Sequence, residues 1–333
     1  MAADFGRTAS MLVLVVAVCA TAPGLARAAT VSAPRAAVQE LVGEHAGDLT
    51  GAAVAPAGDV NGDGRGDVIV GAPLADPAGR ADAGSAYVVF GGGARGRLKL
   101  GALGARGFRI DGAVPLPRGM RHVGSSALTS GAGAVVAGLG DVDGDGLDDV
   151  AVSGREPSAE TVVFVVFGSR DVVPVDLRTL GDRGFVIRSG ADLQVVDGHA
   201  AGDVNGDGRA DIAVRTSVDG DEDAGSVAVV LGRPGSTAVA VGAAAAEGTF
   251  SVSGGLGGML LGHDVAPAGD VDHDGYGDLL LGAPGVAHGR GAVIVLRGSS
   301  RPRDVRIRPG ERFRGRVVRA PTGRMGFGYS VAR

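Results

Sequence analysis

The chain of 333 residues has one cysteine, no tryptophan and only 4 % aromatic residues. A single thiol forms no disulfide within the chain, so disulfides cannot stabilise it. The longest apolar run covers about ten residues near the N-terminus, whereas a transmembrane helix needs about 20. We therefore expect no transmembrane segment.

Glycine, in contrast, is abundant, with 61 residues, and 45 % of the chain is hydrophobic. The hydrophobic content is enough for a buried core, which argues against a disordered chain. The glycines do not recur at every third position, which excludes collagen. A folded, turn-rich and all-β protein is the class that remains.

Residues 1–28 have the pattern of a secretory signal peptide. Arg7 precedes the apolar run from Met11 to Ala20, and Ala26 and Ala28 supply small residues two apart, as at a signal cleavage site. An ordinary N-terminal core helix is the alternative. We expect a mature chain of residues 29–333 that is secreted or associated with the cell surface, without Cys19.

Four segments of nine residues align without gaps and start at Asp59, Asp141, Asp203 and Asp270. The starts lie 82, 62 and 67 residues apart, so the chain is an array of similar units. Counting the first residue as offset 0, Asp or Asn stands at offsets 0, 2, 4 and 8. These residues are Asp59, Asn61, Asp63 and Asp67; Asp141, Asp143, Asp145 and Asp149; Asp203, Asn205, Asp207 and Asp211; and Asp270, Asp272, Asp274 and Asp278.

Short apolar runs follow each acidic segment and predict β-strands. The first run follows offset 8 directly, a second run comes after a Gly- and Asp-containing turn, and a third stretch carries one phenylalanine: Phe108, Phe185, Phe250 and, more weakly, Phe313. With one strand before each acidic segment, this makes about four strands per unit. Buried inner strands and half-exposed outer strands are typical of a propeller blade.

The spacing of the acids indicates calcium loops, about four in number. A tight loop turned by the glycine at offset 5 can aim side chains from offsets 0, 2, 4 and 8 inward, which suits the oxygen coordination of Ca²⁺. The backbone carbonyl at offset 6 completes each set: Arg65, Leu147, Arg209 and Tyr276. The twelfth positions are Val70, Val152, Val214 and Leu281, not the Glu of an EF-hand. Asp-Gly turns that bind nothing are the alternative.

The pattern Gly-Asp-Val-Asn-Gly-Asp-Gly, followed by an apolar run and Gly71-Ala72-Pro73 or Gly282-Ala283-Pro284, resembles the FG-GAP repeat of integrin α-subunit propellers and their bacterial relatives. The resemblance implies a β-propeller of four-stranded blades, with the residues above as calcium ligands. It places units at about 38–112, 113–190, 191–254 and 255–316, and the start of a fifth at 317–333. The family usually closes seven blades, so we expect an incomplete ring of about four to five; a natural five-blade ring is the alternative.

The resemblance also implies a binding or adhesion module for an extracellular protein or glycan. The alternative is a propeller enzyme, or an accessory domain of a secreted hydrolase or lyase that resembles phospholipases or polysaccharide lyases. We find no catalytic constellation outside the acidic loops. The segment from Arg297 to Arg319 holds nine arginines and one aromatic residue. It suits an anionic glycan, a membrane surface or a solvated strand edge, and it lacks the stacking groups of a nucleic-acid site.

Overall fold

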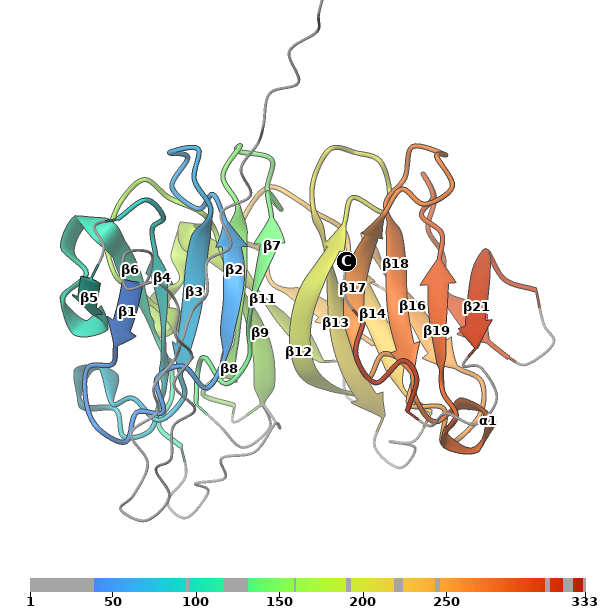
Figure 1. Cartoon of the computed structure of the whole chain (residues 1–333), viewed down its shortest axis with the longest axis horizontal. Helices are drawn as coiled ribbons and strands as arrows, with labels where there is room; N and C mark the ends of the chain where they lie inside the picture. The colour runs from blue at the N-terminus through green and yellow to red at the C-terminus, as the bar shows by residue number, and fades with distance from the viewer. Residues whose placement is uncertain are drawn as a thin grey trace, which may run out of the picture.

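The computed structural model describes residues 39–93, 96–116, 131–158, 160–189, 193–218, 224–242, 246–308, 312–319 and 326–331. The predicted signal peptide lies outside these ranges. Strands dominate, and Figure 1 shows them as sheets arranged side by side from the blue N-terminal end to the red C-terminal end. The all-β prediction is confirmed, and the sheets form an incomplete β-propeller.

The strands fall into five sheets among the described residues. A two-stranded sheet holds β1 (Gln39–Val42) and β5 (Gly96–Lys99). The first large sheet holds β2 (Val54–Gly58), β3 (Asp67–Ala72), β4 (Ser85–Val89), β6 (Gly107–Asp111) and β10 (Val175–Asp176). The second holds β7 (Val136–Gly140), β8 (Asp149–Arg155), β9 (Thr161–Val166), β11 (Gly184–Ser189) and β15 (Val239–Val241).

The third large sheet holds β12 (Leu193–Gly202), β13 (Asp211–Val218), β14 (Ser226–Val230), β16 (Thr249–Gly254) and β20 (Val305–Ile307). The fourth holds β17 (Val265–Gly269), β18 (Asp278–Ala283), β19 (Ala292–Leu296) and β21 (Gly315–Arg319). The helical elements are short: η1 (Pro77–Gly79), η2 (Leu100–Ala102), η3 (Gly104–Arg106), η5 (Leu177–Thr179), η6 (Gly181–Arg183) and α1 (Val286–Gly289).

A strand from the following unit completes three of the large sheets. Four strands of each unit pair antiparallel in sequence order, as expected. The fifth strand pairs parallel with the outer edge: β10 with β6, β15 with β11, and β20 with β16. The sequence prediction of four strands per unit did not include these strands. Each unit is therefore attached to its neighbour by backbone hydrogen bonds as well as by side-chain packing.

The hydrophobic core lies between successive sheets rather than inside any one of them. Neighbouring residues of one strand point to opposite faces, so Val150 packs toward the first sheet and Ala151 toward the third. Both faces of the second sheet are covered, and Val163 and Val165 have no exposed surface. Continuous apolar runs are what such doubly covered strands require.

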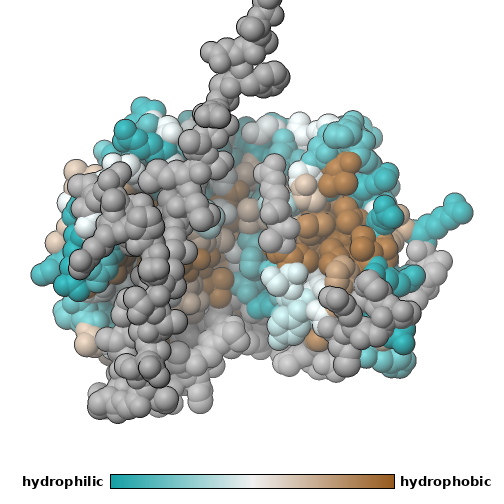
Figure 2. All heavy atoms as spheres, in the orientation of Figure 1, coloured by the Kyte–Doolittle hydropathy of each residue, from teal (hydrophilic) through white to brown (hydrophobic). Residues whose placement is uncertain are grey.

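The fourth sheet differs from the others, and the prediction for Phe313 was wrong in register. Phe108, Phe185 and Phe250 stand opposite Val88, Val165 and Val229 on the neighbouring strand. In the fourth sheet the residue opposite Val295 is Arg316, and Phe313 lies before β21 and packs toward the third sheet. The other face keeps Leu280, Val293 and Val295 partly exposed. Figure 2 shows hydrophobic surface over β18 and β19.

Candidate metal centres

Each acidic loop joins the two innermost strands of one large sheet: β2 to β3, β7 to β8, β12 to β13, and β17 to β18. The glycines at offset 5 all have left-handed backbones, with φ of 81° at Gly64, 87° at Gly146, 88° at Gly208 and 89° at Gly275. A Cβ added to any of them would meet no atom within 4 Å. The glycines are therefore required by backbone conformation, not by space, as the sequence predicted.

Backbone amides turn the carboxylates toward the centre of each loop. In the second loop Asp141 Oδ1 accepts from Asp145 N at 3.1 Å, and Asp141 Oδ2 accepts from Gly146 N at 2.9 Å. Asp143 Oδ1 also accepts from Asp145 N, at 3.0 Å. Leu147 N donates to Asp145 Oδ1 at 2.8 Å. The first and third loops repeat this pattern, so the loop geometry is a property of the spacing.

The acid at offset 8 anchors the loop to its sheet. Asp149 is fully buried; its Oδ2 accepts from Val142 N at 2.8 Å and its Oδ1 from Gly168 N at 2.7 Å. Asp67, Asp211 and Asp278 make the equivalent pair of bonds. The partner glycines Gly91, Gly168 and Gly232 directly follow the second apolar run of their units, and Gly298 follows it after Arg297. The sequence did not reveal this role.

Burial changes the titration of these anchoring acids. Loss of solvation raises the pKa of Asp67 to about 6, that of Asp149 to about 8 and that of Asp211 to about 7, although two backbone N–H groups oppose the shift in each case. A cation near the carboxylate favours the ionised form. A bound metal ion would therefore offset the free-energy cost of ionising these buried carboxylates.

Two groups of acids have ligand oxygens close enough together to coordinate one metal ion. Ligand oxygens of Asp141, Asp143 and Asp149 lie within 4.8 Å of one another, as do those of Asp270, Asp272 and Asp274. Asp272 Oδ1 is buried and has no hydrogen-bond partner. The predicted ligands are all oxygen atoms, which hard cations prefer, and a cation would satisfy that orphaned oxygen. The residues present therefore fit Ca²⁺.

The residues predicted to contribute a carbonyl oxygen stand at the same turn in every loop. Arg65, Leu147, Arg209 and Tyr276 each donate their backbone N–H to the carboxylate at offset 4, at 2.8 to 3.2 Å. They are thus part of the same compact turn as the acids. The loops with Arg65 and Arg209 also place an arginine head near Asp63 and Asp207, at 3.7 and 3.8 Å.

The four loops are hydrogen-bonded to one another in series. Asp148 N donates to Asp59 O at 3.0 Å, Ala210 N to Asp141 O at 2.7 Å, and Gly277 N to Asp203 O at 2.6 Å. In every case offset 7 of one loop bonds the carbonyl at offset 0 of the loop before it. The loops therefore form a continuous row that crosses the junctions between the large sheets.

The fourth loop departs from the other three. His273 takes a left-handed backbone, with φ of 60°, where the other loops have glycine. Two arginines outside the loop pair with its acids: Arg297 with Asp272 at 2.9 Å and Arg314 with Asp274 at 2.8 Å. The sequence did not predict these pairs, because they join residues 25 and 40 positions apart.

Comparison with known proteins gives the same organisation. The model of the FG-GAP repeat matches residues 50–89, 200–230 and 261–296, which contain the first, third and fourth loops. The chain therefore contains FG-GAP repeats. Integrin alpha-4 of Xenopus laevis is 31 % identical over 180 residues, which are 53 % of this chain and 15 % of the integrin. The FG-GAP chain thus spans well under two thirds of that relative.

The second loop lies outside the matched ranges. It nevertheless makes the hydrogen bonds of the matched FG-GAP loops, including both anchoring bonds of Asp149. The second and third units depart from the other two, because they lack Gly-Ala-Pro after the first strand. The departure does not change the loop geometry.

No helix among the described residues has the length and apolar character to cross a membrane.

Proposed function

We propose that this FG-GAP chain is an extracellular binding module whose propeller is stabilised by Ca²⁺ in all four acidic loops. The proposal includes secretion, the ligand residues named above and a protein or glycan as the partner. The likeness to an integrin α-subunit supports a binding or adhesion role in general. The calcium part of the proposal rests on the loops.

The observation that carries the calcium proposal is the row of loops across the sheet junctions. The second and fourth loops gather carboxylates within 4.8 Å of one another, which repel when they are ionised, and each loop is bonded to its neighbour. A bound Ca²⁺ supplies positive charge that offsets this repulsion. Asp141, Asp143, Asp145 and Asp149, with the carbonyl of Leu147, would hold it in the second loop, and the equivalent residues in the others. Metal binding then stabilises the folded chain and its junctions.

The test compares the melting temperature of the purified chain in EDTA and in millimolar Ca²⁺. We expect EDTA to lower the melting temperature by several degrees and excess Ca²⁺ to restore it, since a ligand at about 100 times its Kd adds about 2.7 kcal/mol. Asp145→Ala, at an offset where all four loops have Asp, reduces the response, and Glu247→Gln, at an exposed acid outside the loops, leaves it unchanged. An identical melt with and without Ca²⁺ contradicts the proposal.

A further inference from the structure

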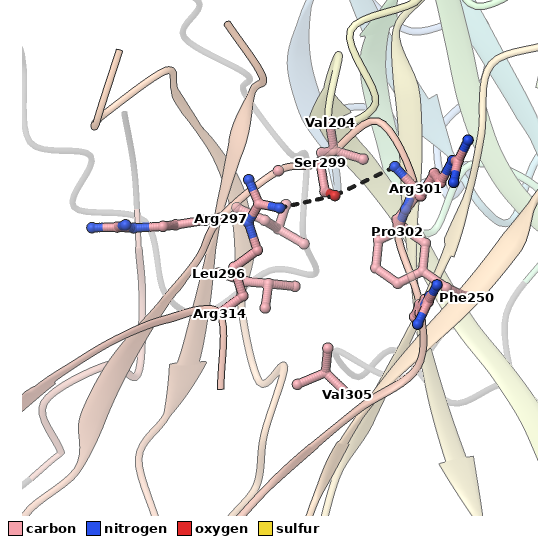
Figure 3. A pocket seen from close by; sticks show the side chains of 12 residues that line it. Val204, Phe250, Leu296, Arg297, Ser299, Arg301, Pro302, Val305 and Arg314 are labelled. Atoms are coloured by element: carbon pink, nitrogen blue, oxygen red, sulfur yellow. Dashed lines mark hydrogen bonds between the residues drawn. The ribbon is translucent and has the colours of Figure 1, made fainter. Parts of the chain in front are cut away.

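A cavity of about 240 Å³ lies between the third and fourth large sheets, under the connection from β19 to β20. Its floor is apolar and includes Phe250, and its rim is basic. Figure 3 shows Arg314 on one side of the cavity, Arg301 and Phe250 on the other and Val305 below them, while the side chain of Arg297 runs away from it. Arg303 also lines the cavity. The basic segment seen in the sequence therefore has an apolar hollow in its middle.

At the junction between the first and second sheets, an arginine side chain occupies the equivalent space. There the guanidinium carbon of Arg183 lies 5.7 Å from the centre of the Phe108 ring. Arg183 and Arg314 occupy equivalent positions, because each precedes the first residue of the outer strand and its carbonyl accepts the N–H that follows the second apolar run. Phe108 and Phe250 are likewise equivalent.

Arg314 is directed elsewhere at the last junction. It donates to Ser299 Oγ at 3.0 Å and to Asp274 Oδ2 at 2.8 Å. The fourth acidic loop thus binds Arg314, whereas the equivalent Arg183 lies over Phe108 at the first junction. The cavity is the room left beside Phe250.

The chemistry of the walls limits what can enter. Arg301 and Arg303 are exposed, and neither side chain pairs with an acid of the described residues. The backbone N–H groups of Gly298, Ser299 and Arg301 already donate to Asp278, Val204 and Ser299. Those amides offer little to the main chain of a peptide. Recognition is left to guanidinium groups and an apolar floor.

The volume of the cavity and the low exposure of Phe250 further restrict the class of ligand that fits. At about 30 Å³ per water in the liquid, 240 Å³ is the room of about eight waters, which suits one sugar ring and is small for a drug-sized ligand. Phe250 lines the cavity but is only 6 % exposed, so it offers a ligand a small apolar contact rather than a broad stacking surface. A ring with an apolar C–H face and an anionic substituent matches the walls.

We propose that this cavity binds one acidic sugar residue of an extracellular glycan. Its carboxylate or sulfate pairs with the guanidinium groups of Arg301 and Arg303, and the C–H face of the ring packs on the floor formed by Phe250 and Val305. The inference rests on the proposed binding function and names its ligand class. It makes the junction beside the fourth acidic loop a second site, separate from the calcium ligands.

The experiment measures binding of oligosaccharides to the full chain in saturating Ca²⁺ by calorimetry. The probes are an oligogalacturonate, a heparin oligosaccharide and a neutral dextran oligosaccharide of similar length, with oligoglutamate and single-stranded DNA as further anions. We expect an acidic oligosaccharide to bind, and the double variant R301Q/R303Q to weaken it by about tenfold or more, since hydrogen bonds between charged groups are lost. Arg306→Gln is the matched control, because Arg306 is exposed on β20 and does not line the cavity.

A preference for the galacturonate assigns the carboxylate as the anchor, and a preference for heparin assigns the sulfate. Equal binding of dextran, oligoglutamate or DNA, or an equal loss with Arg306→Gln, overturns the proposal. Absence of binding also overturns it. If Ca²⁺ still raises the melting temperature in that case, only the acidic-sugar site fails; if Ca²⁺ has no effect on melting, the proposed calcium role fails as well. Binding is compared only among variants whose melting temperatures equal that of the unchanged chain, so that a loss of binding does not reflect unfolding.

Discussion

At the scale of single residues, the buried aspartates at offset 8 stand between two opposing effects. Two backbone N–H groups favour the ionised carboxylate of Asp149, and burial favours the protonated form. Burial has the larger effect, because the side chain has no contact with solvent, and the pKa rises to about 8. The same balance, less extreme, holds for Asp67 and Asp211.

The metal-free chain should therefore lose stability as the pH rises. A carboxyl with a raised pKa in the folded state stabilises fully below its ordinary value of 3.8, and this contribution is lost as the pH passes the folded values of about 6 to 8. We expect the melting temperature in EDTA to fall between pH 5 and pH 8, by roughly a few degrees. Thermal melts at intervals across this range measure the slope.

Two comparisons test the cause of that slope. In excess Ca²⁺ the slope should shrink, because a cation holds the carboxylates ionised. Asp149→Asn should also reduce it, whatever the absolute melting temperature of that variant, and Glu247→Gln should not. A melting temperature in EDTA that rises from pH 5 to pH 8 would contradict the assignment.

At the scale of strands, one position of the outer strand decides how well a sheet covers its neighbour. Phe185 is 1 % exposed, and its ring centre lies 5.9 Å from that of Phe167. The equivalent position of the fourth sheet is Arg316, which is exposed, and the equivalent of Phe167 is Arg297. The first three sheets are therefore built to be covered on this face, and the fourth presents charge there.

Replacing Phe185 or Arg316 by alanine should change the free energy of unfolding by unequal amounts. Phe185→Ala removes a buried ring and should lower the free energy of unfolding by about 3–5 kcal/mol. Arg316→Ala should change it by about 0.5 kcal/mol or less, since the side chain is exposed. Urea unfolding of both variants in Ca²⁺ measures the difference. Comparable losses would show that the faces of the two sheets are equally buried.

At the scale of the whole molecule, stability should follow the number of covered faces. The second and third large sheets have core clusters on both faces. The first sheet is covered on its other side by β5 and residues around it, including Leu98 and Leu100. The fourth sheet has one covered face and a partly exposed one, visible as the hydrophobic area in Figure 2.

Amide hydrogen exchange should report this order. We expect the slowest exchange in β8, β9, β13 and β14 and faster exchange in β19 and β21, because local opening costs least where few apolar contacts are broken. Mass spectrometry of peptides from each strand, in Ca²⁺, gives the comparison. Equal protection of β9 and β19 would mean that the fourth sheet is covered as well as the second.

The sequence by itself determined the features that depend on near neighbours along the chain. The acids at fixed offsets, the glycine at offset 5 and the apolar runs after each loop predict the turns, the strands and the repeated unit, because turn conformation and side-chain alternation are local properties. The acidic loops were placed correctly for this reason, with Gly64 and its equivalents in the left-handed conformation.

Only the tertiary structure decided which contacts form between residues that are far apart in the sequence. The parallel strands that complete three of the large sheets, the bond from Gly168 N to Asp149 and the pairing of Arg314 with Asp274 all join residues at least 19 positions apart in the sequence. The register of β21, which puts Arg316 where other units have phenylalanine, was decided the same way. The physical reason is that such contacts are selected by the free energy of the packed whole, and no short stretch of sequence contains both partners.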